Sequence, residues 1–204
     1  MNNTEELVTS NITLKGEFEP VKFDKLYFVK NEIFNEYEFN ENSLFSKNVV
    51  HISTEDFIIN ISKKQILINF KKKDIDKNKI SRLILNCRKE NSFSIAFNQK
   101  WYKTVADINS ITKEKFFPTH SQYLNEYFNV KDAAFGYYAS KNINKGRFKI
   151  DIKPAILKSI IGGDDLNVIT FDFSYYFEEV DIDFDSDSSL NLLYRESESL
   201  MKNF

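Results

Sequence analysis

Hydrophobic side chains recur at every second position in residues 55–70, EDFIINISKKQILINF. A period of two is typical of a β-strand with one buried face. The polar residues 62–65 interrupt the run and close it as a short loop, which predicts an antiparallel hairpin. In that register, six residues share one face of the hairpin: Phe57, Ile59, Ile61, Ile66, Ile68 and Phe70.

Further apolar runs predict more strands along the chain. KISRLILNC, residues 79–87, and SFSIAF, residues 92–97, form a second predicted hairpin, which closes through residues 88–91. DAAFGYYAS and RFKIDIK are predicted to be strands on either side of the polar turn 141–146. Hairpins that follow one another in this way build a mostly antiparallel sheet.

The stretch FDFSYYFEEVDIDFDSDSS, residues 171–189, requires a change in side-chain parity. Its aromatic residues up to Phe177 occupy odd positions, whereas the apolar residues from Val180 to Phe184 occupy even ones. One unbroken strand cannot bury both sets, because alternate side chains point to opposite faces. We therefore expect a bulge at residues 178–179, although a strand bent across a second layer would also serve. The alternating acids then face water; they are Asp181, Asp183 and Asp185.

Three segments have the features of short helices. Residues 118–121, PTHS, resemble a helix start, and tyrosines at helical spacing continue the helix to Asn129. Residues 103–117 contain a second candidate. Pro154 opens a third over residues 155–161, because proline is favoured in a first turn and the Gly-Gly pair that follows ends helices.

A longer amphipathic helix ends the chain. Ser188 or Ser189 caps it, and leucines at helical spacing continue toward the last residue. The sequence therefore predicts an α+β fold: a mostly antiparallel sheet built from successive hairpins, two or three short helices, and a C-terminal amphipathic helix packed on the sheet. We expect residues 1–204 to form a single domain, with residues 1–10 frayed.

Composition favours a globular protein of a reducing compartment. Of the 204 residues, 42% are hydrophobic and 28% are charged. The start of the chain is acidic and polar rather than signal-like, no apolar run reaches the ~18 residues of a membrane span, and Cys87 is the sole cysteine. We therefore expect a cytoplasmic location. Lysine greatly outnumbers arginine, a bias typical of AT-rich bacterial or phage genomes.

Residues that carry chemistry are few and widely spaced. The chain has no glycine-rich phosphate loop and no G-x-S-x-G motif. His51 and His120 lack metal-ligand spacing, and Cys87 ends an apolar run typical of a core residue. An EF-hand register that starts at Asp181 puts Leu192 where a bidentate Glu is needed. We predict no catalytic, cofactor-binding or metal-binding residues.

Charge is strongly segregated, although the net charge is only −2. Residues 63–89 hold ten basic and two acidic side chains, whereas residues 164–187 hold nine acids and no base. Two solvated faces account for this pattern, and so does recognition of an oppositely charged partner. The interaction candidates are Lys63, Lys64, Lys71, Lys72, Lys73, Lys77, Lys79, Trp101, Tyr102, Asp181, Asp183 and Asp185.

These patterns favour a non-catalytic protein–protein interaction module that associates with itself, as one subunit of a bacterial or phage complex such as a host–phage conflict system. Abundant aromatic residues suit interface anchors. The alternative is a nucleic-acid-binding accessory protein, with the basic hairpin 63–89 on phosphates and Trp101 or Tyr102 stacked on bases. A lower alternative is a metal-dependent phosphodiesterase or nuclease that uses the C-terminal aspartates. The interaction module requires neither a cofactor nor a membrane.

Overall fold

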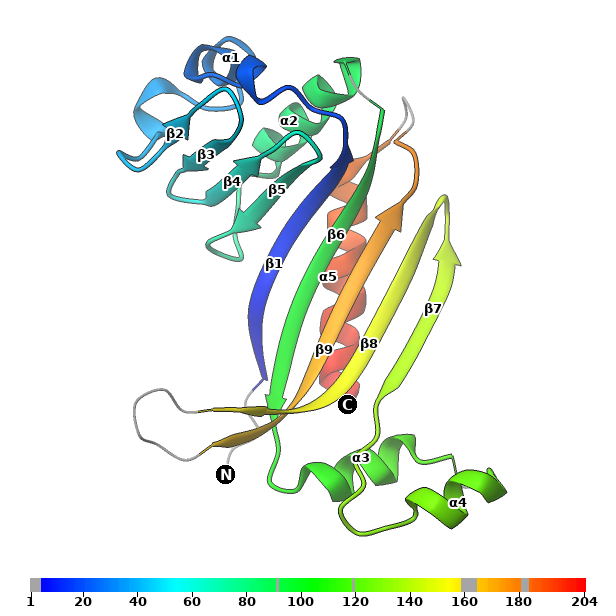
Figure 1. The fold of residues 1–204 in the computed structure, drawn as a ribbon. Helices are drawn as coiled ribbons and strands as arrows, with labels where there is room; N and C mark the ends of the chain where they lie inside the picture. Colours follow the sequence, from blue (N-terminus) through cyan, green and yellow to red (C-terminus); the bar gives the residue numbers. More distant parts are fainter. Residues whose placement is uncertain (1–4, 91, 119, 159–164, 181–183) are drawn as a thin grey trace. The chain divides into compact units, whose positions relative to one another are not determined.

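The computed structural model describes residues 5–90, 92–118, 120–158, 165–180 and 184–204. The fold is α+β, as predicted, with a nine-stranded antiparallel sheet in the order β2-β3-β4-β5-β1-β6-β9-β8-β7 (Figure 1). The strands are β1 (Glu5–Gly16), β2 (Leu44–Phe45), β3 (Val50–Ser53), β4 (Phe57–Ile61), β5 (Gln65–Phe70), β6 (Phe93–Thr104), β7 (Tyr137–Ile143), β8 (Gly146–Leu157) and β9 (Leu166–Phe177). The α-helices are α1 (Lys25–Lys30), α2 (Lys77–Glu90), α3 (Ile108–Phe116), α4 (Gln122–Phe128) and α5 (Ser186–Asn203), and the 3₁₀ turns are η1 (Pro20–Lys22) and η2 (Glu36–Glu38).

The β4–β5 hairpin has the register that the sequence predicts. The Ser62 N–H donates to the Gln65 carbonyl at 2.9 Å and closes the loop. All six alternating residues except Phe70 are buried. The cross-strand pairs are Phe57–Phe70, Ile59–Ile68 and Ile61–Ile66.

The second predicted hairpin is wrong, because its first arm lies in helix α2. Ile80, Leu83, Ile84 and Cys87 recur at spacings of three or four, and all four are buried. They form one stripe of a helix, which a strand would have split between two faces. Leu85, which the strand interpretation puts on the same face as Leu83, is exposed instead.

Strand β1 begins at Glu5, so the expectation that residues 1–10 are frayed is wrong for residues 5–10. β1 lies between β5 and β6 in the sheet, and Asn11 pairs with Asn69 of β5. The Ser10 hydroxyl lies 3.1 Å from the Tyr194 hydroxyl of α5. An interior strand is held on both edges, which explains why residues 5–10 are part of the sheet.

Pro154 lies inside strand β8 rather than at the start of a helix. Proline has no N–H to donate, but its fixed φ is compatible with extended backbone. Residues 155–157 continue the strand, and residues 159–163 of the proposed helix and its stop lie outside the described residues. The other two short helices are confirmed as α3 and α4. The Ser121 hydroxyl caps α4 by accepting from the Leu124 N–H at 3.3 Å.

The parity change after β9 does not use a bulge within the strand. β9 ends at Phe177, and residues 178–179 form a bend that takes the chain out of the sheet. Phe184 then returns to the core beside Phe97 and Phe177, with ring centroids 6.1 and 4.9 Å apart, respectively. Because the chain leaves the sheet at this bend, the alternation of side chains in β9 does not have to continue to Phe184.

Helix α5 is capped by Asp185, not by Ser188 or Ser189. The Asp185 carboxylate accepts from the Ser188 N–H at 2.9 Å and from the Ser188 hydroxyl at 2.6 Å. These bonds satisfy one of the amides that a helix start leaves unpaired. The predicted amphipathic character is confirmed, and its buried residues are Ser186, Ser189, Leu190, Leu193, Ser197 and Met201.

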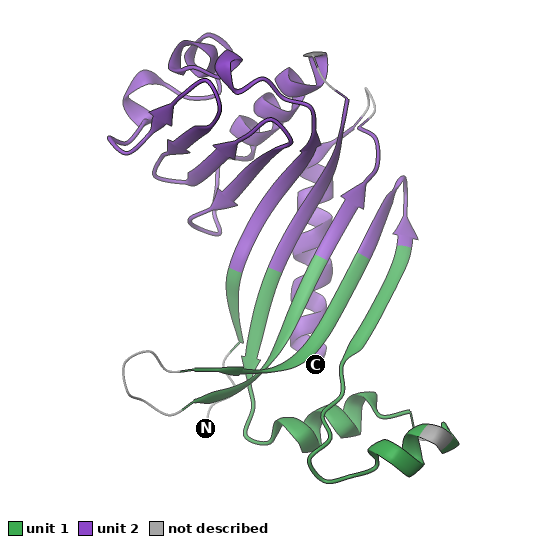
Figure 2. Ribbon diagram, in the orientation of Figure 1, with its two compact units in different colours: residues 1–8, 100–141, 149–173 green, residues 9–99, 142–148, 174–204 purple. Residues whose placement is uncertain are grey.

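The chain divides into two compact units (Figure 2). Unit 1 contains residues 1–8, 100–141 and 149–173, and unit 2 contains residues 9–99, 142–148 and 174–204. Buried residues of unit 1 include Trp101, Ile152 and Phe173. The single-domain expectation stays a prediction. Among the described residues, no helix is both long enough and apolar enough to cross a membrane.

The core of unit 2 lies between its sheet and two helices. α2 and α5 lie on the same face of the unit 2 part of the sheet and contact each other (Figure 1). The Ser81 hydroxyl of α2 lies 2.7 Å from the Ser186 hydroxyl and donates to an Asp187 carboxylate oxygen at 2.7 Å. The other sheet face is polar, and there Asn98 donates to Asn11 at 3.0 Å. Helix α5 therefore has a fixed position within this unit.

Candidate functional site

The lysines predicted to form a basic hairpin lie in three places: the β4–β5 loop, the segment after β5, and the first turn of α2. Lys63 is exposed. The others contact acidic or polar groups of the same chain, and a carboxylate offsets the charge of four of them: Lys64, Lys72, Lys73 and Lys79. These contacts are Lys64–Glu17, Lys71–Ser53, Lys72–Asp56, Lys73–Glu198, Lys77–Asn191 and Lys79–Glu38.

The acids that pair with these lysines all lie outside residues 164–187. Glu38 is one of the two most enclosed of them, together with Asp56, and its partner Lys79 lies over the Phe34 ring at 5.9 Å. Burial acts to raise the pKa of Glu38, but hydrogen bonds from the Asn35 N–H and from Lys79 outweigh it and lower this pKa. These pairs therefore serve the fold of unit 2.

Trp101 does not present a stacking platform, and Tyr102 has its hydroxyl engaged within the chain. Trp101 is 8% exposed, so its ring belongs to the core of unit 1. The Tyr102 hydroxyl donates to Glu6, and this hydrogen bond raises the pKa of Tyr102. Base stacking requires an accessible aromatic face, which Trp101 does not offer.

Of the three predicted aspartates, Asp185 is exposed, as expected, and caps α5. Asp181 and Asp183 lie outside the described residues. Within the ranges that the structure describes, no group of three or more His, Cys, Asp or Glu side chains has metal-binding geometry. Asp185 therefore has a structural role that explains its position without a cation.

The remaining chemically versatile residues are engaged in structural contacts. Ser53 is buried and accepts from Lys71 at 2.9 Å, so its hydroxyl is not open to a substrate. His51 Nδ1 lies 2.8 Å from the Asn60 side-chain oxygen across the β3–β4 pair. Cys87 is buried in α2, as predicted for a core residue.

Sequence reasoning missed an exposed apolar surface on α1. Asp24 caps this helix by accepting from the Tyr27 N–H at 2.7 Å. Phe28 is fully buried and anchors α1 against the rings of neighbouring aromatics. Leu26 and Val29, which share another side of the helix, are left 68% and 36% exposed.

A groove of ≈ 390 Å³ separates α1 from α2. Leu85 of α2 is 41% exposed and adjoins the groove residue Asn86. We call this groove the α1–α2 groove. Val29 and Leu85 are exposed next to its lining residues in the chain. The lining residues are Asp24, Leu26, Tyr27, Lys30, Asn31, Asn86 and Lys89.

The rim of the α1–α2 groove carries a positive charge excess. Lys30 and Lys89 are exposed, and the Lys89 ammonium donates to the Asn86 side chain at 3.2 Å. Asp24 is the acidic residue of the lining, and its carboxylate accepts the hydrogen bond from the Tyr27 N–H that caps α1. The groove therefore combines an exposed leucine, Leu26, with two cationic side chains.

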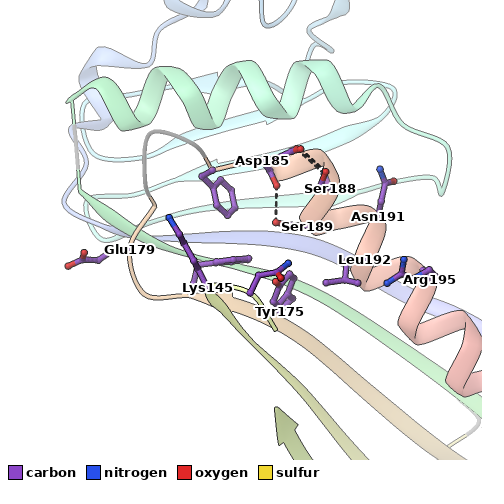
Figure 3. Close-up of a pocket in the computed structure, with 12 residues that line it drawn as sticks. Lys145, Tyr175, Glu179, Asp185, Ser188, Ser189, Asn191, Leu192 and Arg195 are labelled. Atoms are coloured by element: carbon purple, nitrogen blue, oxygen red, sulfur yellow. Dashed lines mark hydrogen bonds between the residues drawn. The ribbon is translucent and has the colours of Figure 1, made fainter. Parts of the chain in front are cut away.

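A larger pocket lies beside α5 in unit 2, with a volume of ≈ 790 Å³ (Figure 3). The β7–β8 turn, the end of β9 and the first turns of α5 enclose it. We call it the α5 pocket. Its lining residues are Asn144, Lys145, Tyr175, Phe177, Glu179, Phe184, Asp185, Ser188, Ser189, Asn191, Leu192 and Arg195.

The α5 pocket has an aromatic wall next to a polar rim. Tyr175 and Phe177 are neighbours with ring centroids 4.5 Å apart, and Phe184 meets Phe177 edge to face. Burial raises the pKa of Tyr175, although a hydrogen bond from the Asn144 side chain opposes this shift. No sequence signal marks this pocket, because its walls come from segments that are remote in the chain.

Comparison with known proteins finds no family model that matches the chain and no curated protein that matches it.

Proposed function

We propose that this chain is a protein–protein interaction module whose α1–α2 groove binds an acidic amphipathic helix of a partner protein. The observation that carries this proposal is the position of Leu26, a leucine 68% exposed on a rigidly anchored helix, beside the cationic rim of Lys30 and Lys89. Exposed apolar side chains beside a groove are characteristic of binding surfaces.

The shape of the groove favours a helix as the ligand. Helix-in-groove recognition inserts apolar side chains at spacings of three and four into a cleft between elements. Leu26 supplies an apolar contact within the groove, and Val29 and Leu85 are exposed next to its lining residues in the chain. Covering such exposed side chains contributes about 25 cal/mol per Å² of apolar area removed from water.

Charge favours an acidic partner. Lys30 and Lys89 would meet carboxylates on the flanks of the bound helix, and this complementarity increases the association rate and suppresses basic partners. Nucleic acid is a poorer fit, because a phosphate backbone has no apolar group that would cover the exposed Leu26 of the groove. The predicted phosphate contacts, such as Lys72 and Lys73, are already paired with acids.

Selection from a displayed library of peptides of about 15 residues, the length of a marginally stable helix, tests the proposal. We expect the enriched peptides to place apolar residues at helical spacing with Asp or Glu beside them. Leu26→Glu should weaken their binding by at least about tenfold, equivalent to about 1.4 kcal/mol. Leu44→Glu is the matched control, since Leu44 is also an exposed leucine but lies on β2.

Two results would contradict the proposal. One is enrichment of basic peptides or of none. The other is an equal loss of binding in Leu26→Glu and Leu44→Glu. Light scattering over a range of protein and salt concentrations decides separately whether a second copy of the chain is the partner, as self-association through the same groove would be abolished by Leu26→Glu.

A further inference from the structure

The α5 pocket is a second site, independent of the α1–α2 groove, and it has the dimensions of a small-molecule site. Its volume of ≈ 790 Å³ lies within the range of about 300–1,000 Å³ typical of ligand pockets. All of its lining residues belong to unit 2. It can therefore hold a whole small molecule.

The wall formed by the β7–β8 turn is fixed without a ligand. The Tyr175 hydroxyl donates to the Ile143 carbonyl at 2.9 Å and ties the end of β7 to β9. Asn144 has a φ of 52°, the left-handed conformation that a two-residue hairpin turn needs. Gly146 lies so close to the aromatic wall that an added Cβ would be 2.5 Å from the Tyr175 ring. Lys145 is thus held at the pocket by a rigid turn.

Phe184 offers the pocket an aromatic surface. The ring is half-buried, and Phe97 stacks on it at 6.1 Å with an interplanar angle of 24°. Phe177 meets it edge to face at 4.9 Å. A planar ring in the pocket would extend this cluster by offset stacking, and Leu192 supplies an apolar contact from α5.

Arg195 supplies the cationic end of the pocket. It lies two turns beyond Ser188 on α5 (Figure 3), and its side chain is 72% exposed. Its guanidinium donates to the adjacent Glu196 at 3.1 Å, which engages part of a five-donor group. The remaining donors suit an anion that can accept two parallel hydrogen bonds, such as phosphate, and Lys145 adds a second positive charge.

The two acids of the lining restrict where an anion can lie. The Asp185 carboxylate is held at the start of α5 by Ser188, so this end of the pocket repels anions. Glu179 lies at the end of β9. The anionic group of a ligand is therefore expected near Arg195, and its uncharged ring near Phe184.

We propose that the α5 pocket binds a mononucleotide, with the base stacked on Phe184 and the phosphate held by Arg195 and Lys145. A nucleotide combines the planar aromatic ring and the anionic group that these side chains match. Base–aromatic stacking tolerates any base, so the pocket selects for the nucleotide class and not for one base.

Isothermal titration calorimetry with AMP and ATP tests this proposal, with adenosine and inorganic phosphate as partial ligands. We expect the nucleotides to bind at least about tenfold more tightly than either fragment. Arg195→Glu should weaken nucleotide binding by at least about tenfold. Lys202→Glu makes the same charge change at an exposed position in the last turn of the same helix and should leave binding unchanged within about twofold.

Three outcomes would overturn the proposal. They are no heat of binding at millimolar nucleotide, equal affinity for AMP and one of its fragments, and equal effects of Arg195→Glu and Lys202→Glu. Circular dichroism of both variants shows that the fold is intact. Neither variant lies in the α1–α2 groove, so a failure here leaves the proposed helix binding untouched.

Discussion

Gly146 is the residue at which the packing of the β7–β8 turn is tightest. A Cβ there would lie 2.5 Å from the Tyr175 ring and 2.7 Å from the Phe177 ring, closer than real contacts allow. Both rings are buried in the core, so they cannot swing into solvent. Because Gly146 has no side chain, the turn can pack against the aromatic wall of the α5 pocket.

Gly146→Ala should therefore lower the free energy of unfolding by about 1–3 kcal/mol, the usual cost of overpacking a core. Urea denaturation followed by circular dichroism measures it. Asn144→Gly is the control in the same turn, because glycine adopts the left-handed conformation of Asn144 without strain. If Gly146→Ala were as stable as the wild type, the close approach of the turn to Tyr175 would be refuted.

Asp185 stabilises α5 through its charge. Hydrogen bonds from the Ser188 hydroxyl and N–H lower the pKa of Asp185, although burial acts to raise it. A lowered pKa in the folded state adds stability above the pKa of the unfolded chain, and this stability is lost as pH falls through the folded value. Below that pH the protonated cap contributes less.

Asp185→Ala should cost about 0.5–2 kcal/mol at neutral pH, as for other lost helix caps. Asp185→Asn should keep most of the stability, because asparagine also caps helices, but remove this part of the acid dependence. Denaturation curves between pH 3 and 7 distinguish the three proteins. Identical pH profiles for the wild type and Asp185→Asn would show that the cap charge contributes nothing.

At the scale of elements, α5 closes the core of unit 2. Leu190, Leu193 and Met201 are buried on its inner face, and Ser197 donates to Gln99 of β6 at 2.5 Å. Its apolar stripe was visible in the sequence because Leu190, Leu193 and Met201 lie at helical spacing. Its cap was misplaced because three serines and two aspartates offer equivalent capping groups.

Deleting residues 190–204 should expose the apolar face that α5 covers and cause aggregation. Size-exclusion chromatography with light scattering detects it. Deletion of residues 202–204 is the control, since this shorter truncation keeps the buried Met201. A monomeric, folded product from the long deletion would mean that α5 is dispensable for the core.

Elements whose sequence pattern lies within one short stretch were predicted, whereas an element that depends on contacts with distant residues was missed. The β4–β5 hairpin was predictable because both arms and the loop lie within one short stretch. Residues 79–87 fit a strand period and a helix period almost equally, and such short runs cannot be distinguished by periodicity alone. The stripe of Ile80, Leu83, Ile84 and Cys87 has to pack on distant elements, which the local pattern does not show.

The assignment of residues 79–87 to a strand also prevented the sequence from indicating the α1–α2 groove. On a strand Leu85 would share a face with Leu83 and Cys87, whereas on α2 it turns outward beside the α1–α2 groove. Leu26 lay in the run KLYFVK, whose four central residues are all apolar or aromatic, so the exposed side was not evident. An accessible surface depends on which residues other elements cover.

At the scale of the whole molecule, charge segregation along the sequence does not persist in space. The lysines of residues 63–89 meet acids from the segment after β1, the β3–β4 turn, η2 and α5. The sequence could not predict this, because the partners are as far as 125 positions away. Linear charge runs therefore overstate the charged patches of this fold.

The ion pairs of these lysines are expected to contribute unequally to the free energy of unfolding. Glu38→Gln removes the partner of a mostly enclosed Lys79 and should cost about 1–3 kcal/mol. Glu17→Gln breaks a pair in which both side chains are almost fully solvated, so its effect should stay below about 0.5 kcal/mol. Thermal or chemical denaturation of both variants checks this ranking, and the reverse order would contradict it.

Recognition through the α1–α2 groove, and not through the lysines of residues 63–73, is tested most directly by NMR chemical-shift mapping with the tightest selected peptide. We predict that the largest backbone shifts fall in residues 24–31, which contain α1 and its cap, and in residues 85–89 of α2. Shifts concentrated at Lys63–Lys73, with α1 unaffected, would contradict it.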